Sequence, residues 1–140
     1  MKRLLAQSEK FKILSEFETV ELVISYPNIL KQNRAVYMGD FYGDPTCALI
    51  SRDEKYLVVG GNGLLIYTLS EPFPSALKTD NKHFKELFRD PKNTWWIDTV
   101  YQSTLDQDWK YFRAVVHTEE GLSVYRIDAE TGEHIKQQCS

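Results

Sequence analysis

The chain has 140 residues, of which 42% are hydrophobic and 13% aromatic. This composition supplies enough apolar surface for one hydrophobic core and excludes an intrinsically disordered chain, which has few aromatic residues. The 17 Lys and Arg residues oppose 20 Asp and Glu residues, and the net charge of −3 does not attract a nucleic-acid backbone. We therefore predict a single domain over residues 1–140 that has no nucleic-acid partner.

The sequence shows no sign of export or membrane insertion. After Lys2 and Arg3 the first apolar run covers only residues 4–6 before polar residues return. This run is shorter than the apolar core of a signal peptide. No run approaches the ~20 apolar residues of a membrane span. Cys47 and Cys139 are far apart and do not form the disulfide framework of a small secreted domain. We expect reduced thiols in a cytoplasmic protein that does not enter the membrane.

Short β-branched and aromatic runs dominate the first half of the chain. TVELVIS (residues 19–25) and TCALIS (residues 46–51) are typical of strands that end at polar turns. KYLVVGG (residues 55–61) and LLIYTL (residues 64–69) are apolar at successive positions. This pattern predicts a strand pair that is covered on both faces and lies near the centre of a sheet.

The glycines of YLVVGGNGLLIY (residues 56–67) allow two interpretations. A phosphate-binding loop needs backbone N–H groups and a following helix N-terminus, whereas LLIYTL is a strand-forming sequence. Asn62-Gly63 is a strong signal for a type I′ hairpin turn. Gly60 and Gly61 would then form a bulge or leave space for an aromatic ring. We favour the turn.

NKHFKELFRD (residues 81–90) is the best candidate for a helix. Phe84, Leu87 and Phe88 are spaced at i, i+3 and i+4. Asp80 or Asn81 can cap the first turn, and Pro91 would end the helix. The first dozen residues show a weaker helical pattern. TWWIDTVYQST (residues 94–104) is instead aromatic and β-branched, which predicts a strand with one solvated face.

The C-terminal third indicates two linked hairpins. KYFRAVVHT joins LSVYRI through Glu119-Glu120-Gly121, and DAETGE (residues 128–133) turns into HIKQ. In both turns a glycine stands where a left-handed residue is needed. Residues 55–67 also resemble residues 110–125, as blades of β-propellers resemble one another. Two copies cannot close a propeller, and we favour convergence of similar hairpins.

Together these elements predict an α+β fold dominated by antiparallel strands. We expect a sandwich or a strongly curved sheet, with one short helix at residues 81–90 packed at its side.

Residue patterns for catalysis or metal binding are absent from the sequence. His83, His117 and His134 show no metal-ligand spacing with each other or with cysteine, and there is no Gly-x-Ser-x-Gly turn. Cys47 lies in an apolar strand, as small buried thiols do. We predict no catalytic residue, no metal and no cofactor. The alternative is a small-molecule-binding or enzymatic β-domain with an aromatic-lined pocket, for which Asp106 and Asp108 are candidate carboxylates.

Acidic residues next to aromatic residues suit a protein interface instead. AVYMGDFYGDP (residues 35–45) is such a segment, although its rings could be core and its aspartates turn formers. Residues 1–12 have a net charge of +3 and residues 118–140 one of −3, so an acidic face could attract a basic protein. The candidate partner-binding residues are Asp40, Tyr42, Asp44, Trp96, Asp106, Asp108, Trp109, Glu119 and Glu120.

Two segments, FYGDPTCALISRDEKYLVVGGNGLLIYTL (residues 41–69) and EEGLSVYRIDAETGE (residues 119–133), carry a resemblance to a known class. The chain resembles small bacterial immunity proteins that neutralise toxins in contact-dependent growth inhibition and related polymorphic toxin systems. The resemblance implies stoichiometric binding to a toxin's basic nuclease domain and blockage of its active site or substrate groove. A further alternative is an assembly module that adds an edge strand to a partner.

Overall fold

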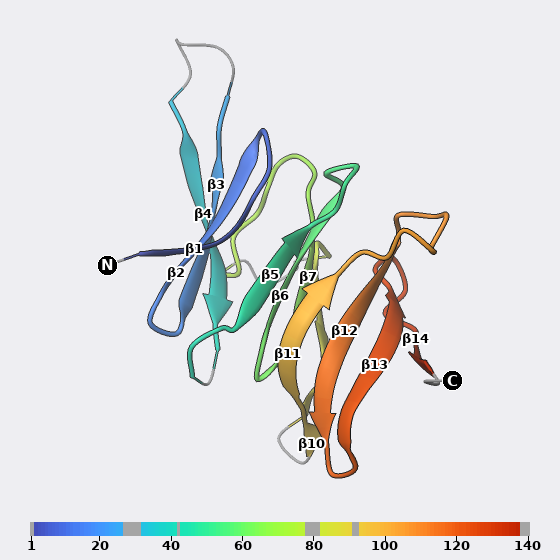
Figure 1. Cartoon of the computed structure of the whole chain (residues 1–140). Helices are drawn as coiled ribbons and strands as arrows, with labels where there is room; N and C mark the ends of the chain where they lie inside the picture. The colour runs from blue at the N-terminus through green and yellow to red at the C-terminus, as the bar shows by residue number, and fades with distance from the viewer. Residues whose placement is uncertain (1, 27–31, 42, 78–81, 91–92, 138–140) are drawn as a thin grey trace.

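The computed structural model describes residues 2–26, 32–41, 43–77, 82–90 and 93–137. Within them the chain forms three four-stranded antiparallel sheets, each made of consecutive strands in chain order (Figure 1). Sheet 1 contains β1 (Arg3–Gln7), β2 (Phe11–Glu16), β3 (Thr19–Ile24) and β4 (Arg34–Asp40). Sheet 2 contains β5 (Cys47–Ile50), β6 (Tyr56–Gly61), β7 (Gly63–Thr68) and β8 (Phe84–Leu87). Sheet 3 contains β11 (Trp96–Tyr101), β12 (Tyr111–Thr118), β13 (Gly121–Asp128) and β14 (His134–Gln137).

Sheet 2 lies between the other two sheets, and its central hairpin supplies both cores (Figure 1). Alternate residues of β6 and β7 point to opposite faces because a strand has a period of two. Leu57, Val59 and Leu65 pack in the core shared with sheet 1. Val58 and Ile66 pack in the core shared with sheet 3. The prediction of a hairpin covered on both faces is confirmed.

The first strands of the three sheets are neighbours, since β5 lies against both β1 and β11. Consecutive four-stranded blades of a β-propeller have this arrangement. The two similar segments of the sequence occupy the same place in their sheets, because β6 and β7 are the middle strands of sheet 2 and β12 and β13 those of sheet 3. The chain therefore forms a stack of three sheets and not a two-sheet sandwich.

The predicted helix at residues 81–90 is wrong for the part of this segment that the structure describes; Asp80 and Asn81 lie outside the described residues. Residues 84–87 form β8, which pairs antiparallel with β7, and Arg89–Asp90 forms β9, which pairs with β10 (Asn93–Thr94). The Phe84 ring packs 4.7 Å from the Tyr67 ring. A ten-residue helix is marginal by itself, and pairing with the apolar β7 offers hydrogen bonds and burial together.

The weaker helical pattern of the first dozen residues is wrong for a similar reason, since these residues form β1 and the start of β2. Antiparallel β structure is therefore confirmed as the dominant class, and the described residues contain no helix. Accordingly, no described segment is a helix long and apolar enough to cross a membrane.

The glycine cluster is a turn, as predicted, but its geometry differs from type I′. Gly63 has a φ of 86°, and its N–H donates a 2.8 Å hydrogen bond to the Trp95 carbonyl. Asn62 does not share the positive φ that type I′ requires and forms a bridge to Trp96 instead. A Cβ on Gly60 would lie 2.8 Å from both the Cys47 Sγ and the Ile97 Cγ2, so this glycine makes room for these side chains.

The two C-terminal turns are confirmed in their key residues. Gly121 and Gly132 have φ values of 108° and 81°, which side chains disfavour. Glu119 and Glu120 form the turn between β12 and β13, and Gly121 begins β13. The register of the two strands runs without interruption from Tyr111↔Asp128 to Thr118↔Gly121.

Comparison of Gly63→Ala with Gly121→Ala tests the glycine turn. Both positions have positive φ, but a Cβ at Gly63 would lie 2.0 Å from the Arg89 Cγ, whereas a Cβ at Gly121 would meet nothing within 4 Å. We expect Gly121→Ala to lower the free energy of unfolding by about 1 kcal/mol through backbone strain. Gly63→Ala should cost roughly 1–3 kcal/mol more through the added clash. Urea unfolding measures both, and equal losses would contradict the packing role of Gly63.

Two buried tyrosine hydroxyls attach connecting segments to the sheets. The Tyr56 hydroxyl donates a 2.7 Å hydrogen bond to the Trp109 carbonyl, and the Tyr67 hydroxyl donates a 3.0 Å hydrogen bond to the Pro74 carbonyl. Burial raises the pKa of both phenols above the ordinary value of 10.0. The folded state therefore holds both protons more tightly than the unfolded state does.

This difference predicts alkaline destabilisation. The stabilising contribution of the two phenols is fully present below the unfolded-state pKa of about 10 and decreases as the pH rises above it, because only the unfolded chain then ionises freely. We expect the free energy of unfolding to fall from about pH 10 upward. Tyr67→Phe should reduce the slope of the free energy of unfolding against pH by the equivalent of at most one proton per molecule. Denaturant titrations between pH 8 and 11.5 provide the measurement; an unchanged slope would contradict the role of Tyr67.

Candidate functional site

The nine predicted partner-binding residues do not form one surface. The strand directions place the β4–β5 loop and the β12–β13 turn at one end of the stack and the β11–β12 loop at the other (Figure 1). Tyr42 lies outside the described residues. Asp106, Asp108 and Trp109 belong to the β11–β12 loop. The other five are at the opposite end: Asp40, Asp44, Trp96, Glu119 and Glu120.

Two acidic side chains of the β11–β12 loop make contacts that stabilise this loop and its junction with β12. The Asp106 carboxylate accepts two 3.2 Å hydrogen bonds from Arg113, and its side chain is only 6% exposed. This hydrogen bond raises the pKa of Arg113. Asp108 accepts a 3.0 Å hydrogen bond from the Lys110 backbone N–H. The buried ion pair with Arg113 accounts for Asp106 without a partner.

At the opposite end, the β2–β3 turn and the β4–β5 loop are joined by hydrogen bonds. The backbone carbonyl of Glu18 accepts a 2.8 Å hydrogen bond from the Phe41 N–H. The Glu18 carboxylate accepts a 3.1 Å hydrogen bond from the Gly43 N–H. The Thr19 hydroxyl donates a 2.9 Å bond to the Asp40 carboxylate. We call the joined surface the Phe17 surface and define it as Glu16, Phe17, Glu18, Asp40 and Asp44.

Phe17 is the most unusual residue of this surface. It is 79% exposed and has a φ of 54°. It stands first in the two-residue turn between the paired Glu16 and Thr19, a position where hairpins favour glycine. The left-handed conformation costs a side chain about 1–2 kcal/mol. An exposed ring on a strained backbone adds nothing to the core, and such a residue is a candidate for function.

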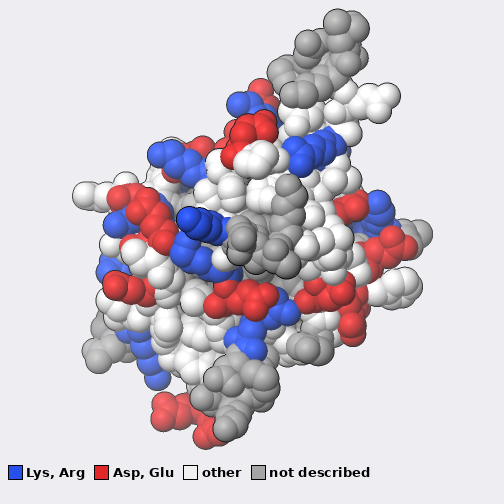
Figure 2. Space-filling view, turned by 180° about the vertical axis from the view of Figure 1, so that it is seen from behind, with Lys and Arg blue, Asp and Glu red and all other residues white. Residues whose placement is uncertain are grey.

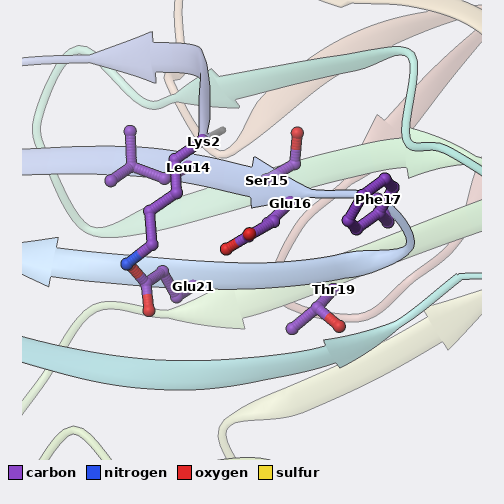
Figure 3. A pocket seen from close by; sticks show the side chains of 7 residues that line it. All are labelled: Lys2, Leu14, Ser15, Glu16, Phe17, Thr19 and Glu21. Atoms are coloured by element: carbon purple, nitrogen blue, oxygen red, sulfur yellow. The ribbon is translucent and has the colours of Figure 1, made fainter.

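Two open hollows flank the Phe17 ring. The first, of ≈ 250 Å³, extends from Phe17 to Lys2 and Glu21, whose ion pair is 2.6 Å long. Figure 3 shows this pair on one side of the hollow and Phe17 on the other, with Glu16 between them. The hydrogen bond to Glu21 raises the pKa of Lys2. The second hollow, of ≈ 270 Å³, is lined by Phe17, Arg3, Ser15 and Asp44.

These hollows do not favour a small-molecule site. Ligand pockets commonly have volumes of about 300–1,000 Å³, whereas these two are smaller and open. A third hollow, of ≈ 200 Å³ beside Tyr56 and Lys110, is smaller again. None of the three has a histidine among its described lining residues.

Four carboxylates lie around Phe17, with Lys2, Arg3 and Arg89 beside them. The four carboxylates all belong to exposed residues. Of the nearby bases, Lys2 is bound to Glu21, Arg3 donates to the Pro45 carbonyl, and Arg89 donates a 2.9 Å bond to the Asp40 carbonyl. On the face seen in Figure 2, acidic and basic side chains are interspersed and neither sign prevails. A partner would therefore meet a small group of acids around one ring, with Arg3 and Arg89 beside them.

The remaining reactive groups form no catalytic or metal site that the described residues reveal. No group of three or more His, Cys, Asp or Glu residues in the described part of the chain could hold a metal ion. Ser70 Oγ and His83 Nε2 lie 2.9 Å apart on an exposed connection. Cys47 is a half-buried thiol whose pKa is raised by burial. His117 lies 3.3 Å from Asp98 on the surface of sheet 3.

No protein-family model, curated protein or solved structure matches the chain. A function is therefore inferred from the geometry of the chain itself.

The sequence predicted only Asp40 and Asp44 of the Phe17 surface. Phe17 lies in SEFETV (residues 15–20), where neither glycine nor proline marks the turn. The available signal was the aromatic residue enclosed by two acids, Glu16 and Glu18, ahead of a β-branched strand.

Phe17→Gly and Phe17→Ala together test whether this residue serves the fold. Glycine relieves the positive φ, whereas alanine retains the strain, and both variants remove the ring. We expect Phe17→Gly to be at least as stable as the native chain and about 1 kcal/mol more stable than Phe17→Ala. Thermal and urea unfolding give the comparison. A clear loss of stability in Phe17→Gly would show that the ring is structural.

Proposed function

We propose that the chain is an immunity (antitoxin-like) protein that binds a cognate toxin domain of nuclease type and covers its active site or substrate groove. The observation that carries this proposal is the exposed Phe17 ring, held at a φ of 54° and surrounded by carboxylates. The Phe17 surface would be the centre of the interface, and the partner would be a protein with a basic surface and an apolar pocket for the ring.

The shape of the Phe17 surface supports protein binding. Interfaces gain most of their affinity from a few central side chains that enter pockets, while the polar rim excludes water. A ring on a two-residue turn between paired strands loses little backbone freedom when it binds, so less entropy opposes association. The hollows on either side of Phe17 leave room for side chains of the partner.

Charge supports a basic partner. A nuclease binds an anionic substrate, so its groove is positively charged. Glu16, Glu18, Asp40 and Asp44 would occupy positions that the phosphates of the substrate otherwise take. Such complementarity speeds association and selects the partner, and salt weakens it.

In this proposal the protein acts by stoichiometric binding in the cytoplasm, without a reaction or a cofactor of its own. Binding a toxin in this way needs neither a deep pocket nor a set of catalytic side chains, and the open hollows around Phe17 are compatible with it.

Co-expression with the product of the gene immediately upstream, which the proposal predicts to be a toxin, tests the proposal. We expect the native chain to restore growth and Phe17→Gly to fail to do so while remaining folded, because loss of a central aromatic anchor costs about 2 kcal/mol or more of binding free energy. Leu77→Lys is the matched control, since Leu77 is 78% exposed but lies outside the Phe17 surface. Growth restored equally by Phe17→Gly, or no protection by the native chain, would refute the proposal.

A further inference from the structure

Ser15 is a polar residue at a position of β2 that faces the core. Phe11 and Ile13 of the same strand belong to the core shared by sheets 1 and 2, and Ser15 shares their face because a strand has a period of two. Ser15 is only 4% exposed. Buried polar groups are normally hydrogen-bonded, but the Ser15 hydroxyl makes no hydrogen bond to a residue that the structure describes. No described side-chain N or O atom is both fully buried and unbonded, so this hydroxyl must open into a hollow.

The strand register places the Ser15 hydroxyl in the second of the two hollows beside Phe17. Ser15 pairs with Arg3, and paired residues extend from the same face of a sheet. Arg3 reaches the Pro45 carbonyl in the β4–β5 loop. In Figure 3 the Ser15 hydroxyl points away from the Glu16 carboxylate, which lines the first hollow. We call the second hollow the Ser15 hollow; it measures ≈ 270 Å³ and is lined by Arg3, Ser15, Phe17 and Asp44.

The Ser15 hollow presents hydrogen-bond donors and acceptors beside an aromatic ring. A guanidinium has five N–H groups, and among the described residues Arg3 donates only to the Pro45 carbonyl. A serine hydroxyl can both donate and accept. The Asp44 carboxylate is an acceptor on an exposed residue and accepts no hydrogen bond from the described part of the chain. A bound group that both accepts and donates would therefore satisfy all three side chains.

We propose that the Ser15 hollow binds the primary amide of an Asn or Gln side chain of the partner protein. The inference rests on the proposed function and specifies which group of the partner lies next to the Phe17 ring. The amide oxygen would accept hydrogen bonds from Arg3 and Ser15, and the amide NH₂ group would donate to Asp44. The flat amide would lie against the ring.

The charges around the hollow favour a neutral group. A carboxylate of the partner would lie beside Asp44, and a Lys or Arg side chain would lie beside Arg3. Like charges placed next to each other at an interface are unfavourable. An amide avoids both contacts. A water molecule takes about 30 Å³ of liquid, so a hollow of ≈ 270 Å³ has room for such a side chain.

The free hydroxyl of Ser15 also makes the hollow selective. A site with polar groups that await a hydrogen bond rejects an apolar group of the same size, because those polar groups would then be covered without a partner. An apolar side chain of the partner would cover Ser15 and Arg3 in this way. The hollow therefore selects an amide over both charged and apolar side chains.

NMR titration of the full chain with three small probes tests this selectivity without the partner. Propionamide has the head group of Gln, propionate that of Glu, and guanidinium that of Arg. We expect propionamide to shift the backbone amide resonances of Ser15, Phe17 and Asp44 with a dissociation constant on the order of 10–100 mM. The charged probes should bind at least about threefold more weakly. No saturable shift with propionamide, or equal binding of a charged probe, would overturn the inference.

Ser15→Ala separates binding from folding. The urea midpoint should not fall, because the hydroxyl makes no hydrogen bond within the described part of the chain. The dissociation constant for propionamide should rise about 2–10-fold through the loss of one hydrogen bond. Ser123→Ala is the control, since Ser123 is also buried but lines none of the three hollows. An unchanged constant in Ser15→Ala, or an equal rise in Ser123→Ala, would contradict the inference.

The growth assay with the product of the upstream gene distinguishes this inference from the proposed function. Ser15→Val puts a branched apolar side chain where the amide would bind, so we expect weaker protection from a variant that thermal unfolding shows to be folded. If the native chain gives no protection, the proposed function fails and this inference fails with it. If the native chain and Ser15→Val protect equally while Phe17→Gly does not, only this inference is overturned.

Discussion

The structure depends on the packing of the β6–β7 hairpin against sheets on both of its faces. Six consecutive residues of β6 and the first five of β7 are buried. Leu57 and Val59 face one core, and Val58 and Ile66 face the other. Burial of a side chain of this size contributes about 1.5–3 kcal/mol. Neither outer sheet has a second apolar layer of its own among the described residues, so both depend on this hairpin.

Close packing at the ends of the central strands follows from this arrangement. Gly60 leaves room for Cys47 and Ile97, and Gly61 lies close to Pro45 and Phe41. A side chain at Gly60 would push β5 and β11 away from β6. The contacts that connect sheet 2 to its neighbours would then be weakened, because β5 and β11 make them. The glycines that suggest a phosphate loop in the sequence therefore serve the contact between sheets.

The sequence predicted local features well and long-range pairing poorly. The turns at Gly63, Gly121 and Gly132 follow from residues that tolerate positive φ, and the double-sided burial of β6 follows from an uninterrupted apolar run. The helical spacing of Phe84, Leu87 and Phe88 was misleading, because it carries no information about the free edge of β7 that residues 84–87 complete. Long-range pairing overrides a weak local pattern of this kind.

The candidate site was likewise predictable only where local sequence carries the information. Acid-aromatic composition indicated Asp40 and Asp44, but composition cannot separate an acid that faces a partner from one that holds a loop, such as Asp106 beside Arg113. Phe17 was missed because its two informative properties, a positive φ and an exposed ring, exist only in three dimensions. The six paired positions of β2 and β3, from Phe11↔Ile24 to Glu16↔Thr19, hold the chain in register and so tolerate the strain at Phe17.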